Sequence, residues 1–182
     1  MTDVMSELTS AYPASPLMGQ MMDQPLLVSS IIEFAARHYG ANEIVSRRVE
    51  GDIHRYTYRE CEARARRMAQ AMQGLGVGMG DRVATLAWNG YRHMELYYAV
   101  SGSGAVLHTI NPRLHPEQIA YIINHAEGQY LFFDMTFLPA IEAMARHCKT
   151  IKGYVAMCGR EHMPRDSNIP MLLCYEDLID SA

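Results

Sequence analysis

The sequence predicts an α/β protein with a mostly parallel central sheet and helices on both faces. From residue 81 onward, short apolar runs typical of buried strands alternate with helical stretches; the runs cover residues 83–87, 105–110, 129–133 and 151–157. The links are short, and repeated strand–helix–strand units of this kind form right-handed crossovers between parallel strands. With 49% hydrophobic and 20% charged residues, a chain of 182 residues has enough apolar surface for one core.

The segment before the sheet, residues 26–80, is expected to be a helix–hairpin–helix lead-in. A first helix is predicted to open at Ser29 or Ser30, because Ser30 and Glu33 have the spacing of a capping box, and to end at Gly40. Its apolar spacing places four residues on one face: Ile31, Phe34, Ala35 and His38.

A hairpin and a second helix follow within this lead-in. Residues 43–49 and 53–56 are β-prone and are joined by the turn at residues 50–52. Thr57 and Glu60 form a second capping-box pattern, which opens a helix running to about residue 75. The arginines of this helix are expected to point largely outward: Arg59, Arg64, Arg66 and Arg67.

The N-terminal residues 1–25 are expected to form a flexible tail. They contain three prolines and five of the 14 methionines and show no periodic pattern. Nothing in their composition indicates a strand or a helix.

Helices are predicted between the strands of the sheet and after the last of them. Asn89 is expected to cap the helix over residues 90–101. Pro116 suits the first turn of the next helix, where no backbone N–H is needed. The predicted helices cover residues 90–101, 117–126, 136–147 and 175–180. A polar loop is expected at residues 159–170.

The glycine-rich stretches do not form nucleotide-binding motifs. Residues 74–80 contain four glycines, but the run closes a helix and precedes a strand, which reverses the order of a dinucleotide-binding turn. We expect it to be a helix end and a tight connector. Residues 101–104 follow a helix rather than a strand, so they are not a nucleophile elbow.

Charge, cysteine and histidine patterns exclude further classes of protein. Sixteen basic against 20 acidic residues leave no basic excess for a sequence-independent nucleic-acid partner. The four cysteines and eight histidines have no metal-ligand spacing, so no metal site and free thiols are expected. Residues 1–22 hold no Lys or Arg, and no apolar run approaches the ~18 residues of a membrane span. We expect a cytoplasmic protein that is not transmembrane.

The segment after the second strand carries the strongest candidate binding residues. Asn111 precedes Pro112 and is therefore extended, so Arg113 projects from a stiff loop at the carboxyl ends of the strands, where open parallel sheets bind ligands. Arg113 either binds a phosphate or carboxylate through the forked donors of its guanidinium, or it is a solvated surface residue. His108 is either structural or a general base. Asp134, after the third strand, is either a helix cap or a ligand contact.

At this segment the sequence resembles a known family. Residues 80–84, the pair Asn89 and Gly90 ahead of a helix, and residues 104–114 occur in the order found in adenylate-forming fatty-acid–CoA ligases. Residues 56–60 resemble the first core motif of that family, and residues 104–114 resemble the second. Residues 107–113 are closer to medium- and long-chain acyl ligases than to peptide-synthetase adenylation domains. The likeness runs from about residue 25 to the end.

The resemblance implies a two-step reaction. A fatty acid and ATP give acyl-adenylate and pyrophosphate, and CoA then displaces AMP; ATP, Mg²⁺ and CoA are the implied cofactors. Fatty acid, ATP and CoA would be the small-molecule partners. A homo-oligomer is also expected, because a truncated domain leaves apolar faces uncovered that self-association would hide. The loops after the second and third strands would border the CoA channel, and no catalytic residue is implied in this chain. The channel residues are Asn111, Pro112, Arg113, Met135, Thr136 and Phe137.

The chain departs from the family in length and in missing motifs. Members are roughly three times as long, and this sequence lacks their phosphate loop, their later ATP-binding motifs and their C-terminal domain with its catalytic Lys. We expect residues 81–182 to be a truncated βαβαβαβ part of the AMP-binding N-terminal domain, an incomplete part of the acyl-CoA synthetase large domain. The chain itself, as an N-terminal fragment, is expected to be inactive.

A different class of function stays open beside this interpretation. The chain could be a stand-alone, non-catalytic α/β ligand-binding or interaction module. A coding sequence that continues past Ala182 into a Ser/Thr/Gly-rich loop ending in Lys would favour the ligase, and a natural stop there would favour the module. A flavodoxin-like cofactor carrier is a weaker alternative, because residues 88–90 have no hydroxyl side chain and only one glycine, too little for a phosphate-binding loop.

Overall fold

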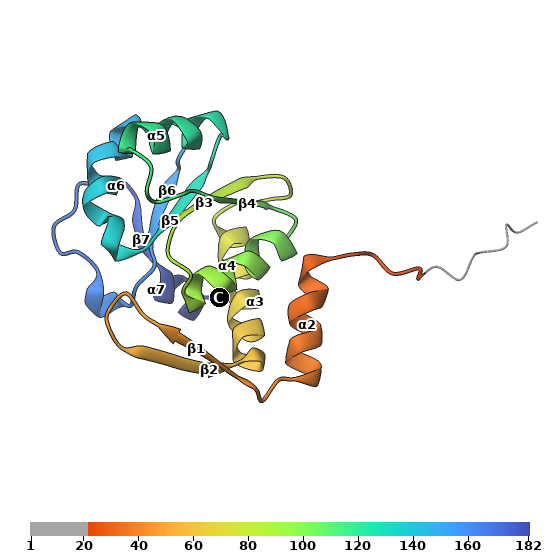
Figure 1. Cartoon of the computed structure of the whole chain (residues 1–182). Coiled ribbons are helices and arrows are strands. Elements are labelled where there is room, and N and C mark those ends of the chain that lie inside the picture. The colour runs from red at the N-terminus through yellow and green to blue at the C-terminus, as the bar shows by residue number, and fades with distance from the viewer. Residues whose placement is uncertain (1–21) are drawn as a thin grey trace, which may run out of the picture.

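A computed structural model describes residues 22–182 of the chain (Figure 1). The predicted tail at residues 1–25 lies for the most part outside the described residues. Residues 22–27 have no regular secondary structure and are exposed, and the first helix begins directly after them.

The predicted parallel sheet is confirmed, and it has one strand more than the sequence indicates. Five strands pair in the order β4-β3-β5-β6-β7, and all four pairings are parallel. The strands are β3 (Arg82–Leu86), β4 (Val106–Thr109), β5 (Tyr130–Phe133), β6 (Gly153–Ala156) and β7 (Leu172–Cys174). β7 escapes prediction because it has only three residues and follows Met171, whose φ of 50° is a turn conformation.

Helices cover both faces of this sheet, as predicted (Figure 1). Successive strand residues point to opposite sides, so in β5 Phe132 belongs to one apolar cluster while Leu131 and Phe133 belong to the other. Helices α3 (Tyr58–Gly74), α4 (Tyr91–Gly102) and α7 (Tyr175–Asp180) pack on the first face. Helices α5 (Pro116–His125) and α6 (Leu138–Met144) pack on the second.

The helix predicted over residues 136–147 is divided into three short pieces. A 3₁₀ turn (η1, Met135–Phe137) precedes α6, and another (η2, Ala145–His147) follows it. Pro139 explains the first division, because it lies in the first turn of α6, where a proline needs no hydrogen-bond donor. A helix that began at residue 136 would have placed this proline further inside.

The lead-in contains the predicted hairpin. Strands β1 (Glu43–Arg47) and β2 (Ile53–Thr57) pair antiparallel, with Val45 opposite Arg55. The hairpin lies against the start of α4, where the Ser46 Oγ accepts a hydrogen bond from the Tyr91 N–H at 3.1 Å. Asn89 therefore does not cap α4: Gly90 occupies the N-cap position, and a hydroxyl from the hairpin accepts the hydrogen bond instead.

Helix α2 (Val28–His38) differs from the prediction at its start and in its buried face. It begins at Val28, so Ser30 lies inside the helix, and its hydroxyl donates to the Leu27 carbonyl at 2.6 Å rather than capping the end. Ile32 is the buried residue of α2, whereas Ile31 and Phe34 are 60% and 56% exposed. The face on which the sequence gathers its apolar residues is thus turned outward.

Helix α3 begins with the capping box that the sequence predicts. The Glu60 N–H donates to Thr57 Oγ1 at 3.3 Å, and the Thr57 N–H donates to Glu60 Oε2 at 2.7 Å. At the other end, the glycine run is a helix end and connector, as expected, with Gly76 and Gly80 at φ values of 83° and 79°. These positive angles suit glycine, which has no Cβ to clash with the backbone.

The capping box generates a stability prediction. Thr57→Ala removes the oxygen that accepts the Glu60 N–H, so the free energy of unfolding should fall by about 1 kcal/mol in urea denaturation followed by circular dichroism. Thr57→Ser keeps the hydroxyl and should retain most of that stability. Equal stability of the alanine and serine variants would contradict this role of the hydroxyl.

Candidate functional site

The loop after β4 presents Arg113 at the carboxyl edge of the sheet, where the sequence predicts it. The Asn111 Oδ1 accepts a hydrogen bond from the Arg113 N–H at 3.0 Å, which closes a turn at the start of the loop. Pro112 is half-buried within it, and the Arg113 side chain is exposed. The backbone of the loop is therefore fixed at its start, while the guanidinium of Arg113 is accessible to an anion.

The loop after β5 carries the second predicted triplet. Met135, Thr136 and Phe137 form the 3₁₀ turn η1, whose middle residue is exposed. The Phe137 ring packs against the indole of Trp88, with ring centroids 5.1 Å apart and an interplanar angle of 41°. This aromatic pair joins the loop after β5 to the loop after β3.

Strand order shows how these loops are arranged. The chain passes from β3 to β4 on one side and then crosses to β5 on the other side of β3, so the direction of winding reverses between β3 and β5. In open α/β sheets the crevice at such a reversal is the usual ligand site. The loop at residues 87–90 therefore lies between the two predicted triplets, and residues 111–113 are one strand removed from the reversal point.

Trp88 is the residue of this edge that sequence reasoning missed. It lies two residues after the end of β3 and is 42% exposed. Its carbonyl lies 3.1 Å from His93 Nδ1, and His93 Nε2 lies 3.0 Å from Thr85 Oγ1, which ties the loop to helix α4 and strand β3. Once the strand order is known, the loops that follow β3 and β5 are the first place to look for a ligand contact, but that order cannot be read from the sequence.

Asp134 connects the two loops at the reversal point. Its Oδ2 accepts a hydrogen bond from the Trp88 N–H at 2.7 Å. Its own N–H donates to the Leu86 carbonyl at 3.1 Å, and its carbonyl accepts from the Phe137 N–H at 2.8 Å. The side chain is thus neither the cap of a following helix nor a free ligand contact, because it binds the neighbouring loop.

Burial sets the protonation of this carboxyl group. Asp134 is 6% exposed, and desolvation raises its pKa to about 6, although the Trp88 N–H and the charge of Arg92 partly oppose the rise. Its pKa is also raised, to a smaller extent, by Glu50.

His108 is placed in β4 with a half-buried ring. Its Nδ1 is buried without a hydrogen-bond partner among the described residues, and desolvation lowers the pKa of the ring. A neutral imidazole without an acidic partner fits the structural interpretation of this histidine better than a general base.

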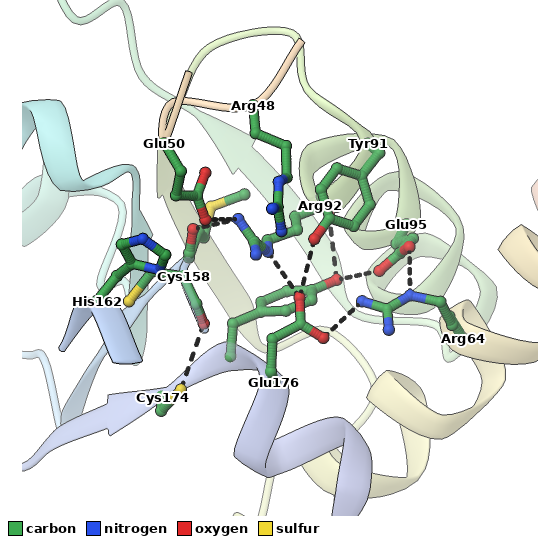
Figure 2. Close-up of polar contacts among 12 residues, drawn as sticks. Arg48, Glu50, Arg64, Tyr91, Arg92, Glu95, Cys158, His162, Cys174 and Glu176 are labelled. Carbon is green, nitrogen blue, oxygen red and sulfur yellow. Dashed lines mark hydrogen bonds and ion pairs between the residues drawn. The ribbon is translucent and has the colours of Figure 1, made fainter. Parts of the chain in front are cut away.

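A second cluster of ionisable side chains lies where α3, α4, α7 and the hairpin meet (Figure 2). Arg64 of α3, which was predicted to point outward, contacts Glu95 at 2.7 Å and Glu176 at 2.9 Å. Arg92 of α4 contacts Glu176 at 2.7 Å and Glu50 at 2.8 Å. We call these five side chains, together with Tyr91 and Tyr175, the charge cluster.

Burial and pairing act in opposite directions in the charge cluster. Desolvation raises the pKa of Glu95, and Arg64 opposes the rise. For Glu176 desolvation also works against ionisation, but Arg64 and Arg92 together hold its pKa below the usual value. The Tyr175 hydroxyl donates to Glu95 at 2.8 Å, so these carboxylates have hydrogen-bonded partners despite their burial.

A cleft of about 750 Å³ borders the charge cluster, but its arginines are already paired. Arg48 pairs with Asp52, Arg160 pairs with Asp177, and Arg92 and Arg64 pair within the charge cluster. A cleft whose cations are neutralised by neighbouring carboxylates is a poor anion site. We therefore interpret the charge cluster as structural and the carboxyl edge of the sheet as the candidate site.

Metal-binding clusters and membrane-spanning helices are absent from residues 22–182. No group of three or more His, Cys, Asp or Glu side chains there is arranged to hold a metal ion. In the same part of the chain, no helix has the length and apolar character needed to cross a membrane.

Comparison with known proteins gives concordant matches. Residues 32–167 match the family model described as AMP-binding enzyme. The chain is 50% identical over 166 residues to a 3-methylmercaptopropionyl-CoA ligase of Ruegeria lacuscaerulensis, covering 91% of this chain and 31% of that protein. It is 46% identical over 163 residues to a medium-chain-fatty-acid–CoA ligase of Ectopseudomonas oleovorans, covering 90% and 30%. The chain thus spans about 30% of the length of these curated relatives.

Solved structures match at the level of the fold. A crystal structure of an anthranilate CoA ligase in complex with anthranoyl-AMP has a TM-score of 0.72 at 22% identity, over 87% of this chain and 29% of that one. A putative long-chain-fatty-acid CoA ligase from Rhodopseudomonas palustris has a TM-score of 0.67 at 24% identity, over 84% and 36%.

The raised pKa of Asp134 predicts a pH dependence of stability. The folded protein keeps this proton up to about pH 6, whereas the unfolded chain loses it near pH 4, so unfolding releases protons in between and stability falls as pH rises through that window. Each pKa unit is worth about 1.4 kcal/mol, which gives a decline of about 3 kcal/mol.

Urea unfolding between pH 4 and pH 7 tests this contribution. The Asp134→Asn variant has no carboxyl group to ionise, so its free energy of unfolding should no longer decline between these pH values. Asp166→Asn, a matched change at an exposed aspartate, should show the same decline as the unmodified protein. Parallel pH profiles for the two variants would show that Asp134 titrates normally.

Proposed function

The chain belongs to the AMP-binding enzyme family, and on that premise we propose that it forms the N-terminal part of a fatty-acid–CoA ligase. The identity of 46–50% to CoA ligases over about nine tenths of the chain is the observation that carries the proposal. In the proposed reaction a carboxylate attacks the α-phosphate of ATP to give acyl-adenylate and pyrophosphate. The CoA sulfur then attacks the acyl carbon and AMP leaves.

The acid substrate is proposed as a fatty acid, with a thioether acid as the second candidate. A long-chain-fatty-acid–CoA ligase of Thermus thermophilus is 49% identical over 83% of this chain and 27% of that protein, which supports the first. The 3-methylmercaptopropionyl-CoA ligases of two Ruegeria species, each 50% identical, support the second. All of these ligases join an acyl carboxylate to CoA, so the proposal commits to that chemistry.

We assign the two predicted triplets to the CoA channel within this proposal. Arg113 is exposed at the carboxyl edge and projects from a turn closed by Asn111, so its guanidinium is available for a phosphate of CoA. Phe137, together with Met135, contributes apolar surface to the second loop. The chain's own part in the reaction is thus to bind and orient CoA, and not to perform either chemical step.

ATP and CoA are the proposed substrates, with Mg²⁺ as the ion that accompanies ATP. Among residues 22–182 no group of three or more His, Cys, Asp or Glu side chains is arranged to hold a metal ion. A cytoplasmic location and a homo-oligomeric state are also proposed. Large apolar side chains exposed on α2, such as Ile31 and Phe34, are consistent with association.

The proposal is tested on the full-length protein that contains this chain. Octanoate, palmitate and 3-methylmercaptopropionate are each mixed with ATP, Mg²⁺ and CoA, and AMP and acyl-CoA are measured. CoA-dependent formation of AMP and an acyl-CoA with at least one acid is the expected result. Absence of turnover with every acid would reject the ligase in favour of a non-catalytic module.

The 182-residue chain alone should be inactive. It spans about 30% of the length of its ligase relatives, so we expect no pyrophosphate release from ATP, Mg²⁺ and palmitate above a heat-denatured control. Release that scales with the concentration of the pure chain would show that adenylation requires no residues beyond it.

Arg113→Ala in the full-length protein should raise the KM for CoA and leave the KM for ATP nearly unchanged. A hydrogen bond to a charged group is worth about 1.5–3 kcal/mol, which corresponds to roughly 10- to 150-fold, and solvent screening at this exposed site will reduce the effect. Steady-state kinetics with CoA and ATP varied separately measures both constants. Arg67→Ala, at an exposed arginine of α3, is the matched control, and an equal effect in both variants would remove the assignment.

A further inference from the structure

Trp88, at the reversal point of the sheet, is not among the residues assigned to the CoA channel. Trp88 is 42% exposed, although its backbone is held on both sides. Its N–H donates to Asp134 at 2.7 Å, and its carbonyl lies 3.1 Å from the ring of His93. An exposed indole on an immobilised backbone is pre-organised for contact with a ligand.

Asp134 holds both members of the aromatic pair. Its carboxylate binds the backbone of Trp88, and its carbonyl binds the backbone of Phe137 at 2.8 Å, while its own N–H is bonded to the end of β3. The 5.1 Å contact between the two rings therefore depends on one buried residue. Burying a carboxylate costs desolvation free energy, and here the buried carboxylate holds the backbone of Trp88 in place.

The position of this pair relative to Arg113 indicates what it contacts. The loop of Trp88 lies between the loop that carries Arg113 and the loop that carries Phe137, because β3 lies between β4 and β5. Arg113 offers a positive charge at the outer strand, and the aromatic pair offers an uncharged, flat surface toward the middle of the sheet. CoA has a matching distribution of charge, with phosphates at one end and an uncharged pantetheine arm, made of methylene, gem-dimethyl and amide groups, leading to the sulfur.

We propose that Asp134 is a positioning residue that sets Trp88 against Phe137, and that the exposed indole face is the wall along which the pantetheine arm of CoA lies. This inference rests on the proposed function and adds Trp88 to the residues that line the CoA channel. Asp134 acts through Trp88 and does not touch CoA.

The first part of the test uses the 182-residue chain, in which Trp88 is the single tryptophan. Asp134→Ala removes the acceptor of the Trp88 N–H, so the emission should shift to longer wavelength and acrylamide should quench it more strongly. Asp134→Asn keeps an oxygen acceptor and should restore the original emission. Circular dichroism confirms that each variant is folded, and an unchanged emission in a folded alanine variant would overturn the positioning role.

A second variant tests the same contact if Asp134→Ala does not fold. Phe137→Leu removes the ring that packs on the indole and leaves Asp134 intact, so it should also shift the Trp88 emission. Asp166→Asn, at an exposed aspartate, is the matched control and should leave the emission unchanged. Equal spectra for the Phe137 variant and the control would show that the aromatic contact does not determine the indole environment.

The second part of the test measures kinetics in the full-length protein. Trp88→Leu and Asp134→Ala should each raise the KM for CoA three- to tenfold with little change in the KM for ATP, and Asp134→Asn should restore the KM for CoA. A parallel rise of both KM values, or an unchanged KM for CoA, would overturn the assignment of the wall. Complete absence of CoA-dependent turnover in the unmodified protein would reject the proposed function, while the emission of Trp88 would still decide the role of Asp134.

The third part identifies the end of CoA that reaches the indole. Pantetheine and adenosine 3′,5′-bisphosphate are titrated separately into the 182-residue chain while the Trp88 emission is followed. A change with pantetheine that is lost in Phe137→Leu supports the proposal. A change with the bisphosphate alone, or with neither probe at millimolar concentration, would contradict it.

Discussion

The rest of the structure depends on buried carboxylates that must be neutralised where three helices meet the sheet. Glu95 of α4 has no exposed side-chain surface, and it is paired by Arg64 of α3 and by the hydroxyl of Tyr175 of α7. Removing one partner of a buried ion pair typically costs about 3–5 kcal/mol, so these helices can take few other relative positions. Arg92 extends the constraint, because it also binds Glu50 of the hairpin (Figure 2). It donates a further hydrogen bond to the Met157 carbonyl, just after β6.

This constraint reaches the candidate site through helix α4. The charge cluster fixes the first turn of α4, which begins one residue after Gly90, and the loop that carries Trp88 leads into that turn. The same loop is fixed from the sheet by Asp134 and from α4 by His93. The charge cluster thus fixes the position of α4 relative to the hairpin. The aromatic pair presents an uncharged surface at the carboxyl edge of the sheet.

Much of the fold could be predicted because its signals are local. The capping box at Thr57, the proline at the first turn of α5 and the apolar run of β5 each act within a few residues, and all were predicted correctly. Two caps were predicted wrongly. Ser30 does not cap α2, because the helix begins at Val28 and the Ser30 hydroxyl donates to the Leu27 carbonyl. Asn89 does not cap α4, where the hydroxyl of Ser46 from the hairpin accepts the Tyr91 N–H.

For this protein the sequence alone determined the alternation of strands and helices, the resemblance to acyl-CoA ligases and the position of Arg113 after a strand. The tertiary structure decided the strand order, and with it the fact that Trp88 rather than Arg113 lies at the reversal point. It also turned Arg64 inward, toward carboxylates 31 and 112 residues away along the chain. Periodicity and capping depend on neighbours in sequence, whereas strand order and charge pairing depend on which distant surfaces are buried together.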